Sequence, residues 1–175
     1  MGKHRGGNGL SVAYRFLNDG NIAIHDERWL TYPWGVNGGT PGQRSTKILI
    51  RADGTKQILP AKCDGVAVKE GDLLYFNTWG GGGWGDPFLR DCNNVLDDVN
   101  RDLVSIEGAK RYGVVIVDGV VDQQQTTLLR AILTEKRGAT QLFDFGGTIE
   151  EIKARCLEET GLPAPKTPSF AKSRV

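Results

Sequence analysis

Hydrophobic residues in the first half of the chain alternate with polar ones or stand in short runs, a pattern typical of β-strands. Residues 10–16 and 21–26 flank an Asn-Asp-Gly turn and are expected to pair as one hairpin. Residues 47–51 and 55–59 flank an Ala-Asp-Gly turn and are expected to form a second hairpin. A further strand is expected over residues 73–78, after a Lys-Glu-Gly-Asp turn.

After residue 90 the apolar positions change to a helical period. They recur at intervals of three and four residues and predict helices near residues 91–111, 122–137 and 148–160. Thr148 and Glu151 fit a capping box at the start of the last helix. The expected fold class is therefore α+β, with an antiparallel β-rich core of hairpins and C-terminal helices packed on it.

These elements are expected to form a single domain of 175 residues, a length that can bury a core without disulfides or metal. In chain order they give a β-rich glycine-loop region over residues 1–90, a helical region over residues 91–162 and an extended tail over residues 163–175. Three prolines between residues 163 and 168 exclude a helix from the tail.

Composition and charge exclude several classes of protein. The 22 Lys and Arg residues balance 21 Asp and Glu residues, so the excess of positive charge typical of nucleic-acid-binding proteins is missing. No apolar run approaches the length of about 18 residues that a membrane span needs, and the basic start of the chain lacks the apolar segment of a signal peptide. The three cysteines form no CxxC pair and are expected to be reduced. We therefore expect a cytoplasmic protein that binds neither nucleic acid nor membrane.

The chain contains 24 glycines, and many of them fall in clusters within residues 2–9, 35–42 and 80–85. Glycine permits a positive φ and a close approach between backbone segments. The clusters therefore predict three tight loops that either pack against a neighbouring segment or hold a ligand.

The third cluster contains the GxGxxG spacing of dinucleotide-binding loops, at Gly80, Gly82 and Gly85. Such a site is disfavoured, because any glycine run matches the spacing and because Pro87 separates the loop from the start of the next helix. The favoured interpretation is a loop packed against another polypeptide, and a ligand-lining loop is the alternative. The candidate residues of this substrate or interface loop are Gly80, Gly81, Gly82, Gly83, Trp84 and Asp86.

Candidates for catalysis or metal binding are few. The chain has two histidines, His4 and His25, and no HxxxH, HExxH or GxSxG motif. We expect no metal site and no catalytic apparatus complete within the chain, and no residue is assigned a catalytic role. Arg5 and Arg28 are candidates for contacts with an anion or carboxylate. Asp86 is held extended before a proline and is expected to point toward one of these arginines or toward an N–H group.

The order of several short motifs resembles the C-terminal region of the hydantoinase B/oxoprolinase family. These motifs lie at residues 2–9 (GKHRGGNG), 26–28 (DER), 33–42 (PWGVNGGTPG), 59–62 (LPAK), 69–72 (KEGD), 78–87 (TWGGGGWGDP), 89–91 (LRD), 112–115 (YGVV) and 159–163 (ETGLP). The resemblance covers nearly the whole chain. The segment at residues 78–87 is similar to the family's TPGGGGYGDP, with Trp79 and Trp84 in place of Pro and Tyr, a difference that bears on the substrate class.

The resemblance implies a small subunit of a multi-subunit, ATP-dependent cyclic amidase of the hydantoinase/oxoprolinase type, which completes the B-type catalytic subunit and is inactive alone. The implied partners are a hydantoinase A-type ATP-binding subunit and the N-terminal part of a B-type subunit, since B-type subunits of the family are several times longer. No cofactor is expected on this chain, whereas ATP with Mg²⁺, and a divalent metal where the enzyme uses one, are expected in the partner subunits. Two alternatives stay open: the equivalent subunit of an ATP-dependent ketone carboxylase of the acetone or acetophenone type, and a non-catalytic scaffold.

Overall fold

The computed structural model describes residues 1–166, which group into two compact units with interleaved segments. Unit 1 consists of Met1–Leu10, Tyr32–Gln43 and Trp79–Gly146. Unit 2 consists of Ser11–Thr31, Arg44–Thr78 and the described residues from Gly147 onward. The chain therefore passes repeatedly from one unit to the other, and each unit is assembled from segments distant in sequence.

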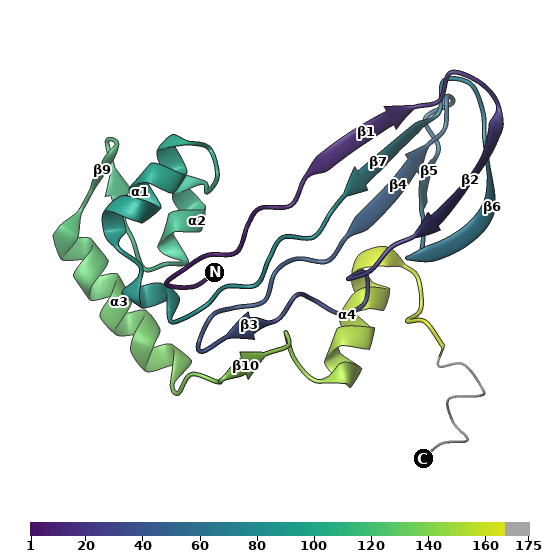
Figure 1. Cartoon of the computed structure of the whole chain (residues 1–175). Helices are drawn as coiled ribbons and strands as arrows, with labels where there is room; N and C mark the ends of the chain where they lie inside the picture. The colour runs from purple at the N-terminus through teal and green to yellow at the C-terminus, as the bar shows by residue number, and fades with distance from the viewer. Residues whose placement is uncertain (167–175) are drawn as a thin grey trace, which may run out of the picture. The chain divides into compact units, whose positions relative to one another are not determined.

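Unit 2 is built mainly from antiparallel strands (Figure 1). Its larger sheet has the strand order β1-β7-β4-β5, and the strands are β1 (Ser11–Arg15), β7 (Leu73–Asn77), β4 (Thr46–Ile50) and β5 (Lys56–Ile58). A two-stranded sheet pairs β2 (Gly20–His25) with β6 (Lys62–Val68), and its register shifts between Ile22 and Ile24.

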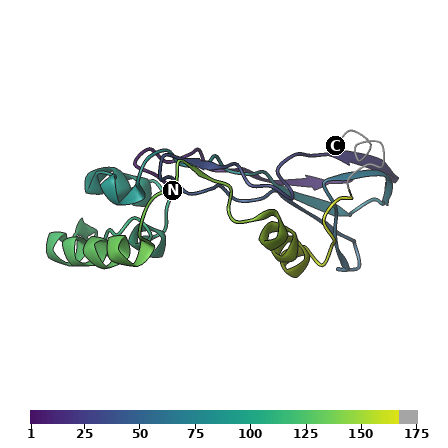
Figure 2. The same cartoon turned by 90° about the horizontal axis from the view of Figure 1, so that it is seen from below.

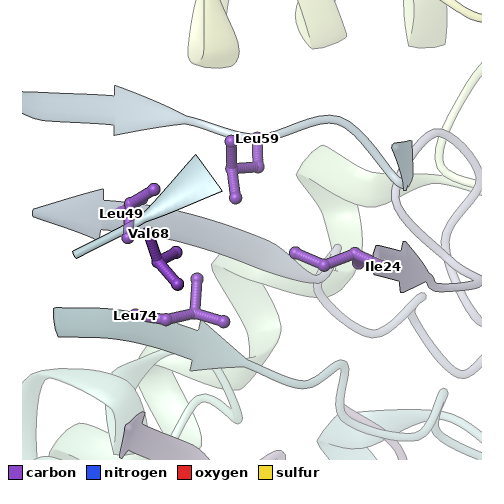
Figure 3. Packing of buried hydrophobic residues seen from close by; sticks show 5 residues of the cluster. All are labelled: Ile24, Leu49, Leu59, Val68 and Leu74. Carbon is purple, nitrogen blue, oxygen red and sulfur yellow. The ribbon is translucent and has the colours of Figure 1, made fainter. Parts of the chain in front are cut away.

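Side chains from both sheets of unit 2 meet in one hydrophobic core (Figure 3). The buried members of this core are Ile24, Leu49, Leu59, Val68 and Leu74. Because successive side chains of a strand point to opposite faces, the burial of Leu49 in β4 leaves Ile48 and Ile50 on the other face of the larger sheet.

The predicted pairing of residues 10–16 with residues 21–26 is wrong, although both strands exist. β1 pairs with β7, and β2 pairs with β6. The turn segment between β1 and β2 lies instead against the turn before β7, where the Asp19 carboxylate accepts a hydrogen bond from the Glu70 N–H at 2.9 Å. Local turn residues thus indicated a change of chain direction, whereas packing in the core decided which strands became neighbours.

The predicted hairpin of residues 47–51 and 55–59 is confirmed by the antiparallel pairing of β4 with β5. The predicted strand at residues 73–78 is confirmed by β7. β6 was not predicted, because Asp64 and Gly65 interrupt its hydrophobic pattern.

α4 (Ile149–Thr160) is the helix of unit 2, and its two ends follow from local sequence. The capping box at Thr148 is confirmed, and Gly161 ends the helix in the left-handed region with φ 69°. Cys156 is buried and packs with Trp29 in a cluster separate from the main core. Figure 2 shows α4 to one side of the strands of this unit.

Unit 1 combines helices with short paired strands. These elements are β3 (Gly35–Val36) paired with β10 (Phe143–Asp144), η1 (Pro87–Leu89), α1 (Cys92–Asn100), α2 (Ile106–Lys110), β8 (Ile116–Val117) paired with β9 (Val120–Val121), and α3 (Gln123–Arg137). The predicted helices near residues 91–111 and 122–137 are confirmed, the first as two helices, with Ser105 as the N-cap of the second. The core of the unit consists of Val95, Ala109, Tyr112, Val114 and Ile116.

The predicted α+β class is confirmed, with antiparallel strands in the N-terminal part of the chain and helices in the C-terminal part. Of the predicted extended tail, residues 163–166 have no regular secondary structure, and the rest lies outside the described residues. Within residues 1–166, no helix combines the length and the apolar character that crossing a bilayer requires.

Candidate functional site

The predicted loop at residues 80–86 lies in unit 1 between two other extended segments (Figure 1). The three segments together, residues 1–9, 33–43 and 79–86, are called the glycine layer. On one side, the His4 N–H donates to the Trp84 carbonyl at 2.9 Å, and the Trp84 N–H donates back at the same distance. On the other side, the Val36 N–H donates to the Gly83 carbonyl and the Gly83 N–H to the Thr40 carbonyl, each at 2.9 Å. The loop is thus held from both sides by backbone hydrogen bonds.

The glycines of this layer stand where backbone approaches backbone. A Cβ added to Gly82 would overlap the Trp34 carbonyl, and one added to Gly39 would overlap the Gly83 carbonyl. A Cβ added to Gly6 would likewise overlap Gly81. Since the obstructing atoms belong to backbone, no side chain can turn away to make room. The glycine clusters therefore pack against one another within this chain.

Trp84 lies at the outer edge of the layer. Its side chain is 49% exposed, and its ring meets the His4 ring at a centroid distance of 5.5 Å with the planes inclined at 44°. Gly81 is also exposed, whereas Gly83 is buried. The layer therefore offers an aromatic and backbone edge to its surroundings, and the indole ring of Trp84 does not anchor the loop by burial in unit 1.

Asp86 ends the loop and ties it to the C-terminal end of α3. Its carboxylate accepts two hydrogen bonds from Arg137, at 2.6 and 2.8 Å, and one from the Phe88 N–H at 2.8 Å. The Arg137 guanidinium also stands 4.6 Å from the centre of the Phe88 ring. The hydrogen bonds from Arg137 lower the pKa of Asp86, against the opposing effect of partial burial. The expected N–H partner is thus present, and Arg137 was not among the residues singled out from the sequence.

Arg5 contacts a carboxylate inside the same unit. Its Nε donates to Asp98 Oδ2 at 3.0 Å, and Arg90 Nη2 donates to the same oxygen at 2.8 Å. Arg5 also donates to the Gly6 carbonyl at 3.1 Å. Two guanidinium groups share one buried carboxylate, so this cluster fixes residues 3–6 of the glycine layer against α1.

Arg28 lies in unit 2, whereas the loop at residues 80–86 lies in unit 1. It adopts a positive φ of 55°, and its carbonyl accepts a hydrogen bond from the Ser45 N–H at 3.0 Å. The structure therefore places the two candidate arginines in different units.

A buried polar cluster in unit 2 was not predicted from the sequence. Lys47 Nζ and Ser45 Oγ both contact the Asp26 carboxylate, and Lys47 Nζ lies 3.2 Å from Ser45 Oγ. Ser–Lys pairs and Ser–His–Asp triads act in hydrolytic sites, but Ser45 and Lys47 are 0% exposed, so no substrate reaches them. We interpret the cluster as a buried ion pair of the core. The signal that could have revealed it is strand alternation, which places Lys47 on the same face as Leu49.

Metal-binding residue types are not gathered in the described part of the chain, where no group of three or more His, Cys, Asp or Glu side chains could hold an ion. His25 Nε2 lies 2.9 Å from Asp64 in an exposed pair of unit 2. His4 lies in unit 1, against Trp84.

Comparison with known proteins relates the chain to one family. The sequence model of the hydantoinase B/oxoprolinase family matches residues 1–87. An uncharacterised protein of Methanocaldococcus jannaschii is 40% identical over 136 residues, which are 75% of this chain and 24% of that protein. A protein of Pseudomonas sp. (strain NS671), named as the B-type subunit of a D-/L-hydantoinase, is 31% identical over 135 residues, which are 75% of this chain and 23% of that protein. The chain thus spans about a quarter of the length of these relatives.

Among the solved structures that resemble the chain are a caprolactamase and an acetone carboxylase. The ATP-dependent caprolactamase from Pseudomonas jessenii matches with a TM-score of 0.55 and 28% identity, over 74% of this chain and 24% of that one. Acetone carboxylase in its nucleotide-free form matches with a TM-score of 0.61 and 23% identity, over 90% of this chain and 25% of that one. At 23% identity, the likeness to acetone carboxylase shows a shared fold.

Proposed function

Since this chain belongs to the hydantoinase B/oxoprolinase family, we propose that it forms part of an ATP-dependent enzyme that opens cyclic amides. The observation that carries the proposal is the agreement between the family match and two similar proteins, the D-/L-hydantoinase protein and an ATP-dependent caprolactamase. Hydantoin and caprolactam are both rings closed by an amide bond. The shared chemistry, rather than either individual ring, is what we assign to this chain.

We propose that the chain acts together with further polypeptide sequence, because it spans about a quarter of the length of its relatives. The partners are a hydantoinase A-type subunit that binds ATP and Mg²⁺, and the N-terminal part of a B-type subunit. A divalent metal, where the enzyme uses one, belongs to those partners as well.

ATP serves this reaction because an amide carbonyl is a poor electrophile. Transfer of a phosphoryl group to the amide oxygen makes the carbonyl carbon easier to attack. Water then adds to that carbon, the C–N bond of the ring breaks, and the ring nitrogen leaves as an amine, so that an acyl phosphate remains. A second water hydrolyses the acyl phosphate and releases phosphate and the carboxylate. The net products are ADP, phosphate and the ring-opened amino acid.

Within the enzyme, we assign the exposed edge of the glycine layer to contact with substrate or with a partner segment. This edge contains Gly81, Trp84 and His4, all exposed. The backbone hydrogen bonds and the Asp86–Arg137 pair hold the edge in one conformation, which favours a precise binding surface.

A substrate panel on the assembled complex tests the proposal. We expect release of phosphate from ATP in step with ring opening of hydantoin, 5-oxoproline or caprolactam, and no ring opening when this chain is omitted. A complete complex that opens none of these rings, or opens them without this chain, would reject the function.

A ketone carboxylase is the second candidate function, because the motifs of the sequence leave the equivalent subunit of such an enzyme open, and acetone carboxylase shares the fold over 90% of this chain. The same complex, given ATP, bicarbonate and acetone or acetophenone, separates the two candidates. Loss of ketone that depends on bicarbonate, without ring opening of any cyclic amide, would favour the carboxylase.

A further inference from the structure

The larger sheet of unit 2 has one face in the hydrophobic core, and strand pairing defines which residues share the opposite face. Leu74 of β7 pairs with Leu49 of β4, and both are buried in the core. Residues one position away on each strand therefore point to the other side of the sheet. This other side is called the open face here.

An apolar row crosses the open face from edge to edge. Tyr75 pairs with Ala13 on one side and with Ile48 on the other, and Ile48 pairs with Ile58. The side chains of Tyr75 and Ile58 are each 37% exposed, and Ala13 is exposed as well. The row thus includes a residue from each of the four strands.

Such a row is unusual for a sheet face in water. An antiparallel sheet with one solvated face normally carries polar side chains on that face. Contiguous exposed apolar residues on a folded protein mark a surface that another molecule covers. The open face therefore has the character of an interface.

The charged groups around the row indicate the kind of molecule that covers it. The neighbouring row on the open face begins with Arg15 and ends with Lys56, with Leu73 and Ile50 between them. The row on the other side contains Ser11, Asn77 and Thr46. The paired residues of this face thus include two cations and no carboxylate.

This charge distribution disfavours a second copy of the chain as the occupant. Two open faces packed together would place cations on both sides of the contact, and like charges across an interface are unfavourable. A surface with an apolar strip bordered by carboxylates would be complementary to the open face.

We propose that the open face binds the remainder of a hydantoinase B-type polypeptide, through an apolar strip bordered by acidic side chains. The matched segment is 23% of the D-/L-hydantoinase protein, so a large B-type polypeptide lies outside it and supplies a candidate for this contact. The inference rests on the proposed function, because it takes its partner from the same enzyme. It adds the surface by which the two parts join.

A binding experiment tests the surface directly. The chain is mixed with a polypeptide that comprises the B-type sequence outside the matched quarter, and the dissociation constant is measured without ATP or cyclic amide. Tyr75→Lys, Ile58→Lys and Ala13→Lys each place a charge on the open face at an exposed site. We expect each to raise the dissociation constant by at least about tenfold, as for central residues of an interface.

Matched controls lie in the same unit but off the sheet. Leu17→Lys and Leu157→Lys introduce the same charge at apolar residues that are 71% and 53% exposed, and should leave binding unchanged. Circular dichroism checks that each variant is folded, and Ile58→Lys and Ala13→Lys on the edge strands β5 and β1 serve if Tyr75→Lys misfolds.

Three results would overturn the inference: no binding by the unmodified chain, unchanged binding by all three open-face variants, or a homodimer of the chain that these variants dissociate. The binding and activity measurements together distinguish failure of this inference from failure of the proposed function. Loss of binding in a complex that opens no cyclic amide would reject the function and keep the interface, whereas active complexes with unimpaired variants would do the reverse.

Discussion

Asp86 connects three parts of unit 1 through one carboxylate. It accepts hydrogen bonds from Arg137, 51 positions later in the chain, and caps η1 by accepting one from the Phe88 N–H. Its side chain is 21% exposed and that of Arg137 is 27% exposed, so solvent screens the pair less than it screens a surface ion pair. The carboxylate therefore contributes to stability as long as it is ionised.

Asp86→Asn is expected to lower the free energy of unfolding by about 1–3 kcal/mol at neutral pH, because a charge-assisted pair of hydrogen bonds is weakened. The pKa of Asp86 is lowered in the folded protein, so its contribution is fully present above the unfolded-state pKa of about 3.9 and is lost as the pH falls through the lower folded-state value. Urea unfolding at pH 7 and at pH 3 measures both effects.

The control for this variant is Asp118→Asn, which removes the same charge at an exposed position in the same unit. Asp118 has a positive φ of 49°, which asparagine tolerates well. A difference between Asp86→Asn and the unmodified protein that stays constant down to pH 3 would contradict the assigned role.

Residues that act locally could be predicted from the sequence, and residues that act across the chain could not. Thr148 was identified because its capping box lies within four positions. Arg137 and Asp98 were missed as partners of Asp86 and Arg5, because nothing within a few positions of either residue signals a contact so far along the chain.

At the level of elements, the close packing of the glycine layer requires residues without a Cβ where its segments cross. Its three segments exchange backbone hydrogen bonds at separations that only glycine permits at the crossing points. The clusters were recognisable in the sequence as close-packing loops. That they pack against each other could not be predicted, because glycine carries no side chain whose pattern would identify its neighbour.

Gly82→Ala tests the layer. The added Cβ would overlap the Trp34 carbonyl and approach the Gly35 N–H, so the backbone must shift, and we expect a loss of about 3 kcal/mol, the upper end of the usual cost of overpacking. Chemical unfolding of the purified protein measures the loss.

Gly7→Ala is the matched control, since a Cβ at Gly7 would meet no atom within 4 Å. This variant should be as stable as the unmodified protein, or slightly more stable because its unfolded chain is less flexible. Equal stability of the two variants would show that the close approach at Gly82 contributes nothing.

Strand pairing shows the same division between local and distant information. The β4–β5 hairpin follows from a turn between two adjacent strands. The pairs β1–β7 and β2–β6 join strands separated by other elements, and the choice between such partners depends on which apolar faces bury each other in the core.

At the level of the whole molecule, the family match and the compact units divide the chain differently. Residues 1–87 match the family, and they include all three segments of the glycine layer together with the strands of unit 2. The order of the motifs was enough to identify the family from the sequence. The open face was not predicted, because it depends on the register of four strands that are brought together only in the fold.

Trp84→Ala tests whether the edge of the glycine layer takes part in the reaction proposed for the assembled complex. Trp84 is 49% exposed and contacts His4, so its removal should leave this chain folded. We expect ATP-dependent ring opening per assembled complex to fall at least about tenfold, which corresponds to about 1.4 kcal/mol of transition-state stabilisation. Leu89→Ala, at a side chain 66% exposed in the adjacent η1, should retain full activity. If Trp84→Ala weakened assembly while each assembled complex kept full turnover, the non-catalytic scaffold would be the better description, because the exposed ring would then serve only to bind a partner.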